Sequence, residues 1–335
     1  MHGDDELVSA AEAARLLGVI PATLYAYVSR GLIRSERAAG RAHRYFAADI
    51  AALRRGGRPQ GPVVATAITL RRGGQVFFRG HDAVELARRL SVREAAALIW
   101  NCDPVSSFEA DNVPEAPPDP AVRDALGGAS PLSRMLVLLQ LAIRREPRWP
   151  DAGNAFYGYA GARLLRFLAA AAAGARPSPR PVEAVLAAAW NLGREARPLL
   201  RAAIILAADN GVDAAALAAR AAAAAGLPPW RSVAAGLAAL DFDDAETGDD
   251  RAGALLAMLP PPSSGPRSLA RAVAKLGETL GFPPDGAATL YGIGRVIGLM
   301  AHVAEERGAR RPCRARGTYV GVMPPAPPIP QFGKG

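Results

Sequence analysis

The stretch LLRAAIILAADNGVDAAALAAR, residues 199–220, decides the architecture of most of this chain. Its first half is apolar on every side and leaves no polar face wide enough for a surface helix, so it predicts a helix buried inside a helical domain. Asp209, Asn210, Gly211 and Asp213 then interrupt the apolar run, since short polar residues around a glycine compete with the helical backbone for hydrogen bonds. Two buried helices joined at a polar corner are predicted. Such a corner could hold a site, but an ordinary turn explains it equally well.

The composition favours closely packed helices. Half of the 335 residues are hydrophobic, only 6% are aromatic, and alanine dominates. This length allows a large core and more than one domain. The predicted fold class is all-α: an N-terminal winged helix-turn-helix module, followed by a multi-helix body that opens with a small β-hairpin.

The charge and the cysteines limit the partners of the chain. The formal net charge is +9 and is carried almost wholly by arginine, a bias that a GC-rich genome explains, so the total alone is weak evidence for nucleic acid. Cys102 and Cys313 have no metal-type spacing, and no metal site is predicted. Without a secretory signal, a reducing cytoplasm is expected. The longest apolar runs are too short to span a bilayer, so no membrane partner is expected.

A helix-turn-helix is predicted at the N-terminus. Ser9 and Glu12 have the spacing of a capping box, which starts a short amphipathic helix that Gly18 ends. Pro21 suits the first turn of a second helix, closed by Gly31. Two short helices with a tight turn between them are typical of DNA-binding modules.

A wing and a basic cluster follow these helices. Leu32 to Tyr45 predicts a strand, a loop with a glycine and a second strand, and Ala47 to Arg55 predicts a further helix. Between Arg30 and Arg58 stand eight arginines and only two acidic residues. Such clustering is what phosphate contacts require, although a solvated basic face in an arginine-rich proteome is the alternative.

The module resembles the MerR-type and excisionase-type winged helix-turn-helix, in which ARLLGV, LYAYVSRGLI and the tyrosine after the wing recur. By that resemblance, the residues that face the major groove are Ala22, Thr23, Tyr25 and Ala26. The residues that hold phosphates are Arg30, Arg37, Arg41 and Arg44.

Composition shifts mark the remaining boundaries. GGRPQGPV, residues 56–63, is a Gly/Pro linker, and residues 66–78 alternate around Gly73 and Gly74 like a hairpin. The predicted domains are a DNA-binding module at 1–58, a linker at 59–65, a helical body at 66–321 with a smaller subdomain at about 185–275, and a proline-rich tail at 322–335.

The body resembles the citrate synthase family over about three quarters of the chain. The motifs follow the family's order: TAITL from Thr66, FFRGHDAVELA, SVREAAALIW, SPLSRMLVLLQLA, LLRAAIILAAD, LYGIGRVIGLMAHVAEE from Leu290, and RP...YVG from Arg311. Citrate synthases fused to a helix-turn-helix form a bacterial subgroup. The resemblance implies a dimer that condenses acetyl-CoA with oxaloacetate, using a carboxylate base and two histidines that stabilise the enol and polarise the acceptor ketone.

The family's catalytic residues do not recur at the aligned positions. The first histidine, from a His-Ala-Asp-His-Glu run, falls on Asn210, and the second falls on Ala245. Ala245 lies in the acidic segment DFDDAETGDD, residues 241–250, which is expected to repel acidic substrates. The aspartate base is expected near Ala270 or Arg271, where no carboxylate stands. No catalytic residue is therefore assigned.

Two arginines match binding positions of the family. Arg295 matches the arginine that pairs with an acceptor carboxylate, and Arg311 matches one that the neighbouring subunit supplies. Retention for packing or for interface salt bridges explains both equally well. His302 also matches a family position, and its apolar helix face predicts a structural role.

Three functions remain open. The first is a DNA-binding regulator with a non-catalytic body, which dimerises and retains a pocket for a di- or tricarboxylate. The second is a non-catalytic subunit that pairs with an intact citrate synthase paralogue and completes that partner's site with Arg311. The third is an active citrate or 2-methylcitrate synthase. The expected partners are DNA and a second subunit, identical or paralogous; no cofactor is expected, and acetyl-CoA enters only as a substrate of the third.

Overall fold

A computed structural model describes residues 7–29, 32–37, 43–54, 64–115, 120–146, 153–240, 249–262 and 268–309. The chain is mostly helical, which confirms the predicted all-α class. Buried apolar side chains form two separate clusters, one within residues 8–50 and one within residues 68–304. Each cluster is the core of one of the two predicted parts, the N-terminal module and the helical body.

The N-terminal module is a helix-turn-helix with a wing. Its elements are β1 (Leu7–Ser9), α1 (Ala10–Leu17), α2 (Pro21–Ser29), β2 (Ser35–Arg37), β3 (His43–Phe46) and α3 (Ala47–Arg54). Ser9 Oγ accepts from the Glu12 amide at 3.2 Å, and Gly18 ends α1 with a left-handed φ of 67°. The predicted wing strands pair, and β1 adds an unpredicted third strand, in the order β1-β3-β2.

The body begins with a hairpin and continues as a stack of helices. Its strands are β4 (Thr69–Arg72), β5 (Gln75–Phe78) and β6 (His81–Asp82). Its helices are α4 (Ala83–Arg89), α5 (Val92–Trp100), α6 (Pro104–Ser107), α7 (Pro120–Ala125), α8 (Pro131–Ala142), the 3-10 helix η2 (Ile143–Arg145), α9 (Asn154–Ala173), α10 (Val182–Ala189), α11 (Ala196–Leu206), α12 (Ala214–Ala224), α13 (Pro229–Ala238), α14 (Asp250–Ala257), α15 (Leu269–Leu280) and α16 (Gly286–Arg307). The predicted hairpin is confirmed, with both turn glycines at positive φ.

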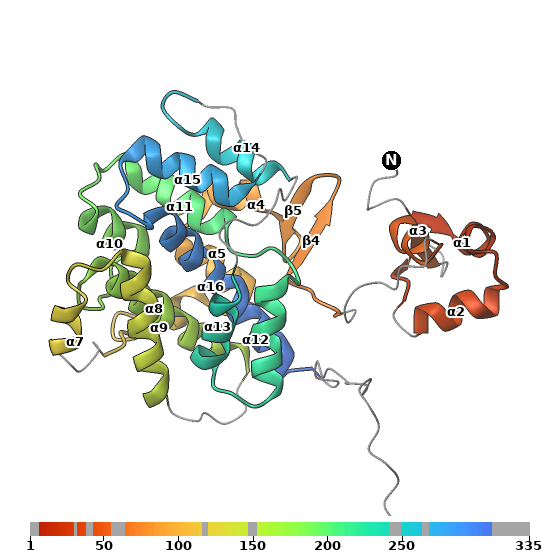
Figure 1. The fold of residues 1–335 in the computed structure, drawn as a ribbon, viewed down its shortest axis with the longest axis horizontal. Coiled ribbons are helices and arrows are strands. Elements are labelled where there is room, and N and C mark those ends of the chain that lie inside the picture. Colours follow the sequence, from red (N-terminus) through yellow and green to blue (C-terminus); the bar gives the residue numbers. More distant parts are fainter. Residues whose placement is uncertain are drawn as a thin grey trace, which may run out of the picture.

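Helix α16 runs through the centre of the body (Figure 1). By length and apolar composition alone it could cross a membrane, but 89% of its most apolar window is buried within the protein, as in a core helix. Gly294 and Gly298 let it approach the end of α11 closely, since a Cβ at Gly298 would lie 2.4 Å from the Ala208 carbonyl oxygen. The Gly298 amide donates to that same oxygen at 2.9 Å, so the helix backbone lies against the polar corner.

The segment from α11 to α12 has the form that its sequence predicts. Leu199, Leu200 and residues 202–208 are buried, and the chain leaves the helical conformation before Asp209. Gly211 takes a φ of 77°, and Asp213 then caps α12, because its Oδ1 accepts from the Ala216 amide at 2.8 Å. Two buried helices joined by a polar corner are therefore confirmed.

Candidate functional site: the corner between α11 and α12

Asp209 is the centre of the corner, and its side chain is wholly buried. Its Oδ2 accepts from the Thr69 hydroxyl at 2.6 Å and from the Gly211 amide at 2.8 Å. Its Oδ1 lies 3.4 Å from Arg295 Nη1. A buried carboxylate with several donors around it is held as an anion, so Asp209 organises the polar groups near it.

Arg295 lies on α16, and its side chain is wholly buried too. Its closest charged partner is Asp213, whose Oδ2 accepts from Arg295 Nη2 at 2.6 Å. Asp213 is the more open partner, with 24% of its side chain exposed, whereas Asp209 has none. The arginine that the sequence predicts as a carboxylate binder is thus bound by two carboxylates of its own chain.

Asn210 uses both ends of its side-chain amide inside the protein. Its Nδ2 donates to the Tyr291 hydroxyl at 2.8 Å, and its Oδ1 accepts from Arg251 Nη2 at 2.9 Å. Arg251 is wholly buried and donates from Nη1 to the carbonyl oxygens of Leu206 and Asp209 at 2.9 and 2.7 Å. These bonds fix the end of α11 and the orientation of Asn210 together.

Asp249 forms ion pairs with two arginines at the edge of the corner. It accepts from Arg251 Nε and Nη2 at 3.0 and 2.8 Å, and from Arg71 Nη1 at 2.8 Å. It also caps α14 through the Arg251 amide. The sequence predicts that residues 241–250 repel anions, and this stays a prediction; Asp249, one of the acidic residues of that segment, is paired with arginines. Residues 241–248 lie outside the described part of the chain.

The first strand of the body, β4, reaches the corner with alternate residues. The Ala67 amide, just before the strand, donates to Glu305 Oε1 at 2.8 Å. Thr69 binds Asp209, and Arg71 binds Asp249 and lies 3.5 Å from the carbonyl oxygen of Asn210. Successive side chains of a strand alternate between its two faces, so Thr69 and Arg71 turn the same face toward the corner.

Below the corner, a second ionic cluster joins α12 to α16. Arg220 Nε donates to His302 Nδ1 at 3.1 Å, and His302 Nε2 lies 3.3 Å from Asp209 Oδ1. Arg220 also pairs with Glu306 at 3.0 Å and with Glu305. His302 is wholly buried, which fits the structural role that the sequence predicts for it.

The charges of the corner balance one another. Burial opposes the ionisation of Asp209, but His302 and Arg295 beside it hold the pKa of its carboxyl well below the usual value. Burial likewise opposes the ionisation of Asp249, and Arg251 and Arg71 outweigh it and lower the pKa of that carboxyl. For Arg295, burial favours the neutral form, but Asp213 and Asp209 raise the pKa of the guanidinium. The three carboxylates face three guanidiniums, those of Arg71, Arg251 and Arg295.

This arrangement holds charges in place but is poorly suited to moving a proton. A general base works best with a pKa near the operating pH, and a carboxyl with a strongly lowered pKa is a weak proton acceptor. The Asn210 amide does not change its protonation near neutral pH as histidine does. Within the described residues, no group of three or more His, Cys, Asp or Glu side chains could hold a metal ion.

Several predicted positions fall away from this corner or outside the described residues. Ala270 and Arg271 lie at the start of α15, and Arg271 is exposed. The position of the family's second histidine, Ala245, and the predicted partner-site arginine, Arg311, are both outside the described part of the chain. Among the family positions that the sequence predicts, Asn210 and Arg295 both lie at the corner. Arg251 binds the side chains of both Asn210 and Asp249.

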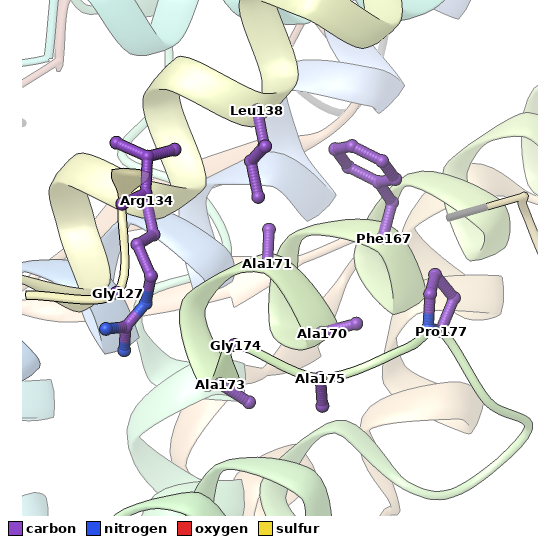
Figure 2. A pocket seen from close by; sticks show the side chains of 11 residues that line it. Gly127, Arg134, Leu138, Phe167, Ala170, Ala171, Ala173, Gly174, Ala175 and Pro177 are labelled. Atoms are coloured by element: carbon purple, nitrogen blue, oxygen red, sulfur yellow. The ribbon is translucent and has the colours of Figure 1, made fainter. Parts of the chain in front are cut away.

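A hollow of about 290 Å³ lies elsewhere in the body, between α8 and the end of α9. Figure 2 shows it lined by Leu138, Phe167 and small side chains of α9. Arg134 lies at its edge, but its two terminal nitrogens donate to the carbonyl oxygens of Ala129 and Ala172 at 2.8 Å each. Arg134 thus connects the turn at Ala129 to the end of α9. The other side chains that line the hollow are apolar.

The predicted DNA-contacting residues lie on α2 and the wing. Ala22 and Tyr25 are exposed, Tyr25 over 55% of its surface, and Thr23 and Ala26 are half-buried. The intervening Leu24 is wholly buried and anchors α2 in the module.

The wing residues are only partly described. Arg44 is exposed on β3, and Arg37 ends β2 opposite His43. Arg30 and Arg41 lie outside the described residues. Arg34 differs from Arg44, because its guanidinium binds the Asp49 carboxylate at 2.9 Å and lies 4.4 Å from the Phe46 ring centre. One of the eight arginines in this stretch is therefore paired within the module.

The sequence does not predict four further residues whose side chains bind the corner residues Asp209, Asn210 and Asp249. They are Thr69, Arg71, Arg251 and Tyr291. A weak signal exists for Arg71, since it stands at alternate spacing from Thr69 on the predicted hairpin. Arg251 follows Asp249 at the start of a helix and so has a local carboxylate partner. For Tyr291, which is distant in sequence from Asn210, no local pattern indicates the contact.

Comparison with known proteins agrees with this architecture. Residues 59–245 match the family model of the citrate synthase C-terminal domain, and residues 7–58 match that of a helix-turn-helix domain. No curated protein sequence matches the chain.

Solved citrate synthases share the fold at low sequence identity. The enzyme from Thermotoga maritima MSB8 is 18% identical with a TM-score of 0.61, over 79% of this chain and 95% of that one. The enzyme from Thermoplasma acidophilum, solved with carboxymethyl coenzyme A and oxaloacetate, is 16% identical with a TM-score of 0.57, over 79% and 95%. The enzyme from Pyrobaculum aerophilum is 16% identical with a TM-score of 0.61, over 80% and 92%. This chain thus belongs to the citrate synthase family and carries a helix-turn-helix domain at its N-terminus.

Proposed function

We propose that this protein is a DNA-binding regulator whose citrate-synthase-like body has lost catalysis. The observation that carries the proposal is the state of the corner. Where the resemblance places a catalytic histidine stands Asn210, and both polar atoms of its side chain are bound by Tyr291 and Arg251. Both ends of this amide are tied to the protein, and an amide cannot change its protonation near neutral pH as the family's histidine does.

The carboxylates of the corner support the same conclusion. His302 and Arg295 lower the pKa of Asp209, and Arg251 and Arg71 lower that of Asp249, which makes both carboxylates weak bases. Arg295, the guanidinium expected to bind the acceptor, is bound by Asp213 and Asp209. The body therefore keeps the family's architecture, while Asn210, Asp209, Asp249 and Arg295 are bound by other groups of the same chain.

The DNA-binding part of the proposal rests on the helix-turn-helix. Ala22 and Tyr25 give α2 an exposed face of small and aromatic side chains, which suits contact with base edges in the major groove. Arg44 is exposed on the wing, where phosphate contacts are expected. We place the module at residues 1–58 and the body at 66–321, and we expect a cytoplasmic homodimer.

The loss of catalysis is tested with the purified full-length chain, acetyl-CoA and oxaloacetate, by following the release of free thiol. We expect release at the background rate, because the loss of one oxyanion-type donor alone costs on the order of 100-fold or more in rate. An intact citrate synthase in the same buffer is the positive control. Turnover above background would contradict the proposal and favour an active citrate or 2-methylcitrate synthase.

DNA binding is tested by fluorescence anisotropy on labelled duplexes over a range of salt concentrations. Affinity is expected to fall steeply with salt, with a log–log slope of about −0.9 for each phosphate that the protein neutralises. Absent or salt-independent binding would remove the DNA part. Native mass measurement then separates a homodimer, which we expect, from a heterodimer with an intact paralogue, in which Arg311 would complete the partner's site.

A further inference from the structure

The corner contains a buried guanidinium whose main partner is open to solvent. Arg295 has no exposed side-chain surface, whereas Asp213 keeps 24% of its side chain exposed. A buried cation is strongly destabilising unless a carboxylate neutralises it, so the identity of that carboxylate matters for folding and for ligand access.

Asp213 and Asp209 bind Arg295 with different strength. The carboxylate of Asp209 is shared with the Thr69 hydroxyl and the Gly211 amide, and it approaches Arg295 only to 3.4 Å. Asp213 commits Oδ2 to Arg295 at 2.6 Å. At this distance the second contact is a short charge-assisted hydrogen bond, and it is the stronger of the two.

The two oxygens of Asp213 perform separate tasks. Oδ1 caps α12 through the Ala216 amide at 2.8 Å, and Oδ2 binds Arg295. The cap needs only a short side chain with an acceptor oxygen, whereas the bond to Arg295 needs the reach and the charge of a carboxylate. These tasks can be separated by substitution.

We propose that Asp213 is an internal ligand that closes the corner: its carboxylate occupies the face of Arg295 on which a small external carboxylate would bind. The ligand class of the opened site is a monocarboxylate of about the size of the aspartate head group, such as formate. This inference rests on the proposed loss of catalysis, since an Arg295 that is closed by Asp213 would not bind an acceptor acid. In the unaltered chain the site is closed, so the corner does not sense di- or tricarboxylates through Arg295.

The test uses thermal unfolding of full-length variants in sodium formate and in sodium chloride of equal ionic strength. Asp213→Ser keeps an N-cap oxygen, removes the charge and vacates the space of the carboxylate. Its Tm is expected below that of the unaltered chain, and saturating formate is expected to raise it by about 5 °C. The unaltered chain, whose site is filled, should respond equally to formate and chloride.

Two further variants are matched controls. Asp213→Asn removes the charge but fills the same space, so it should be destabilised and show no formate-specific response. Asp213→Ser combined with Arg295→Met has the space but no guanidinium, and it should not respond either. If Asp213→Ser fails to fold, Asp213→Asn still decides, because a Tm equal to that of the unaltered chain would show that the charge is dispensable.

Three results would overturn the proposal. The first is a formate-specific rise in the Tm of the unaltered chain that is as large as the rise for Asp213→Ser. The second is a Tm of Asp213→Ser that chloride restores fully. The third is a Tm of Asp213→Ser equal to that of the unaltered chain. Thiol release by the unaltered chain would instead contradict the proposed loss of catalysis, and it is measured separately, so the two failures are distinguishable.

Discussion

The corner of the body and the surface of the DNA-binding module use arginine in opposite ways. In the corner, Arg251 and Arg295 are wholly buried, and each has a carboxylate partner within hydrogen-bond distance. On the module, Arg44 is exposed on β3 of the wing. Removing a buried, paired arginine is destabilising, because its carboxylate partner stays buried. An exposed arginine is accessible to a phosphate of DNA. In an arginine-rich chain, the environment of each guanidinium is therefore more informative than the net charge.

The strongest way to break this comparison is Arg251→Ala. This change removes one of the two arginine partners of the buried Asp249, the other being Arg71, and takes away the donor to the carbonyl oxygens of Leu206 and Asp209. We expect the free energy of unfolding to fall by about 3–5 kcal/mol, measured by denaturant titration. Arg88→Ala is the matched control, because Arg88 is 61% exposed and pairs only with Glu85 on its own helix. A loss of similar size in both variants would contradict the distinction.

The next largest effect is expected on DNA affinity. Replacing Arg37, Arg41 and Arg44 together by Gln should lower affinity at least tenfold and reduce the magnitude of the salt slope by about three, one for each lost phosphate contact. Anisotropy titrations at several salt concentrations give both quantities. The control is again Arg88→Gln on the body, and an unchanged slope in the triple variant would place the DNA surface elsewhere.

Glu146 sharpens the comparison, because it is a partly buried carboxyl without the close arginine pairs of the corner. Its carboxylate accepts from the amides of Trp230 and Arg231 at 2.8 and 3.0 Å at the start of α13. Burial outweighs these bonds and the charge of Arg231, and it raises the pKa of Glu146 to about 7. The unfolded chain releases this proton near pH 4.5 and the folded chain only near pH 7, so stability falls as pH rises through that window and levels off above it.

The pH effect is measured as the difference in unfolding free energy between the unaltered chain and Glu146→Gln from pH 4 to pH 8. The unaltered chain is expected to lose about 1–2 kcal/mol relative to the variant, less than the full pKa shift implies because the group is partly solvated. Glu94→Gln is the control. A hydrogen bond from the Ser91 amide lowers the pKa of Glu94, so that group is ionised throughout the upper part of this window. A difference that stays constant with pH would contradict a raised pKa at Glu146.

The smallest effect concerns a paired arginine within the module itself. Arg34→Gln removes the bond to Asp49, a pair that is partly exposed, and should lower the stability of the module by about 1 kcal/mol or less. Because Arg34 is held by Asp49 and Phe46, we expect the salt slope of DNA binding to stay unchanged. A drop in slope like that of Arg44→Gln would mean that pairing does not separate structural from DNA-contacting arginines here.

The local patterns of the sequence predict the elements better than their partners. The run from Leu199 to Arg220 predicts both helices and the corner because burial and turn chemistry are written in neighbouring residues. The short strand β1 escapes prediction, since three residues before a helix show too little alternation to indicate a strand.

Ion pairing within the site depends instead on the tertiary fold. The packing of β4 and α16 against the corner brings Arg71 to Asp249 and Arg295 to Asp213. Residues so distant in sequence leave no periodic signal in a single chain. The resemblance predicts Arg295 as a candidate binding residue, but only the packed structure places two carboxylates beside it.

The bonds of β4 also bear on where the polypeptide can be divided. Ala67, Thr69 and Arg71 are the first residues of the body, and they supply hydrogen bonds to Glu305, Asp209 and Asp249. A body fragment that starts after Gly74 would lose both the hydroxyl that donates to the buried Asp209 and an arginine partner of Asp249. Separate expression of the body therefore requires a start point upstream of Ala67, within residues 55–63 or before, so that the strand stays with the helices that it completes.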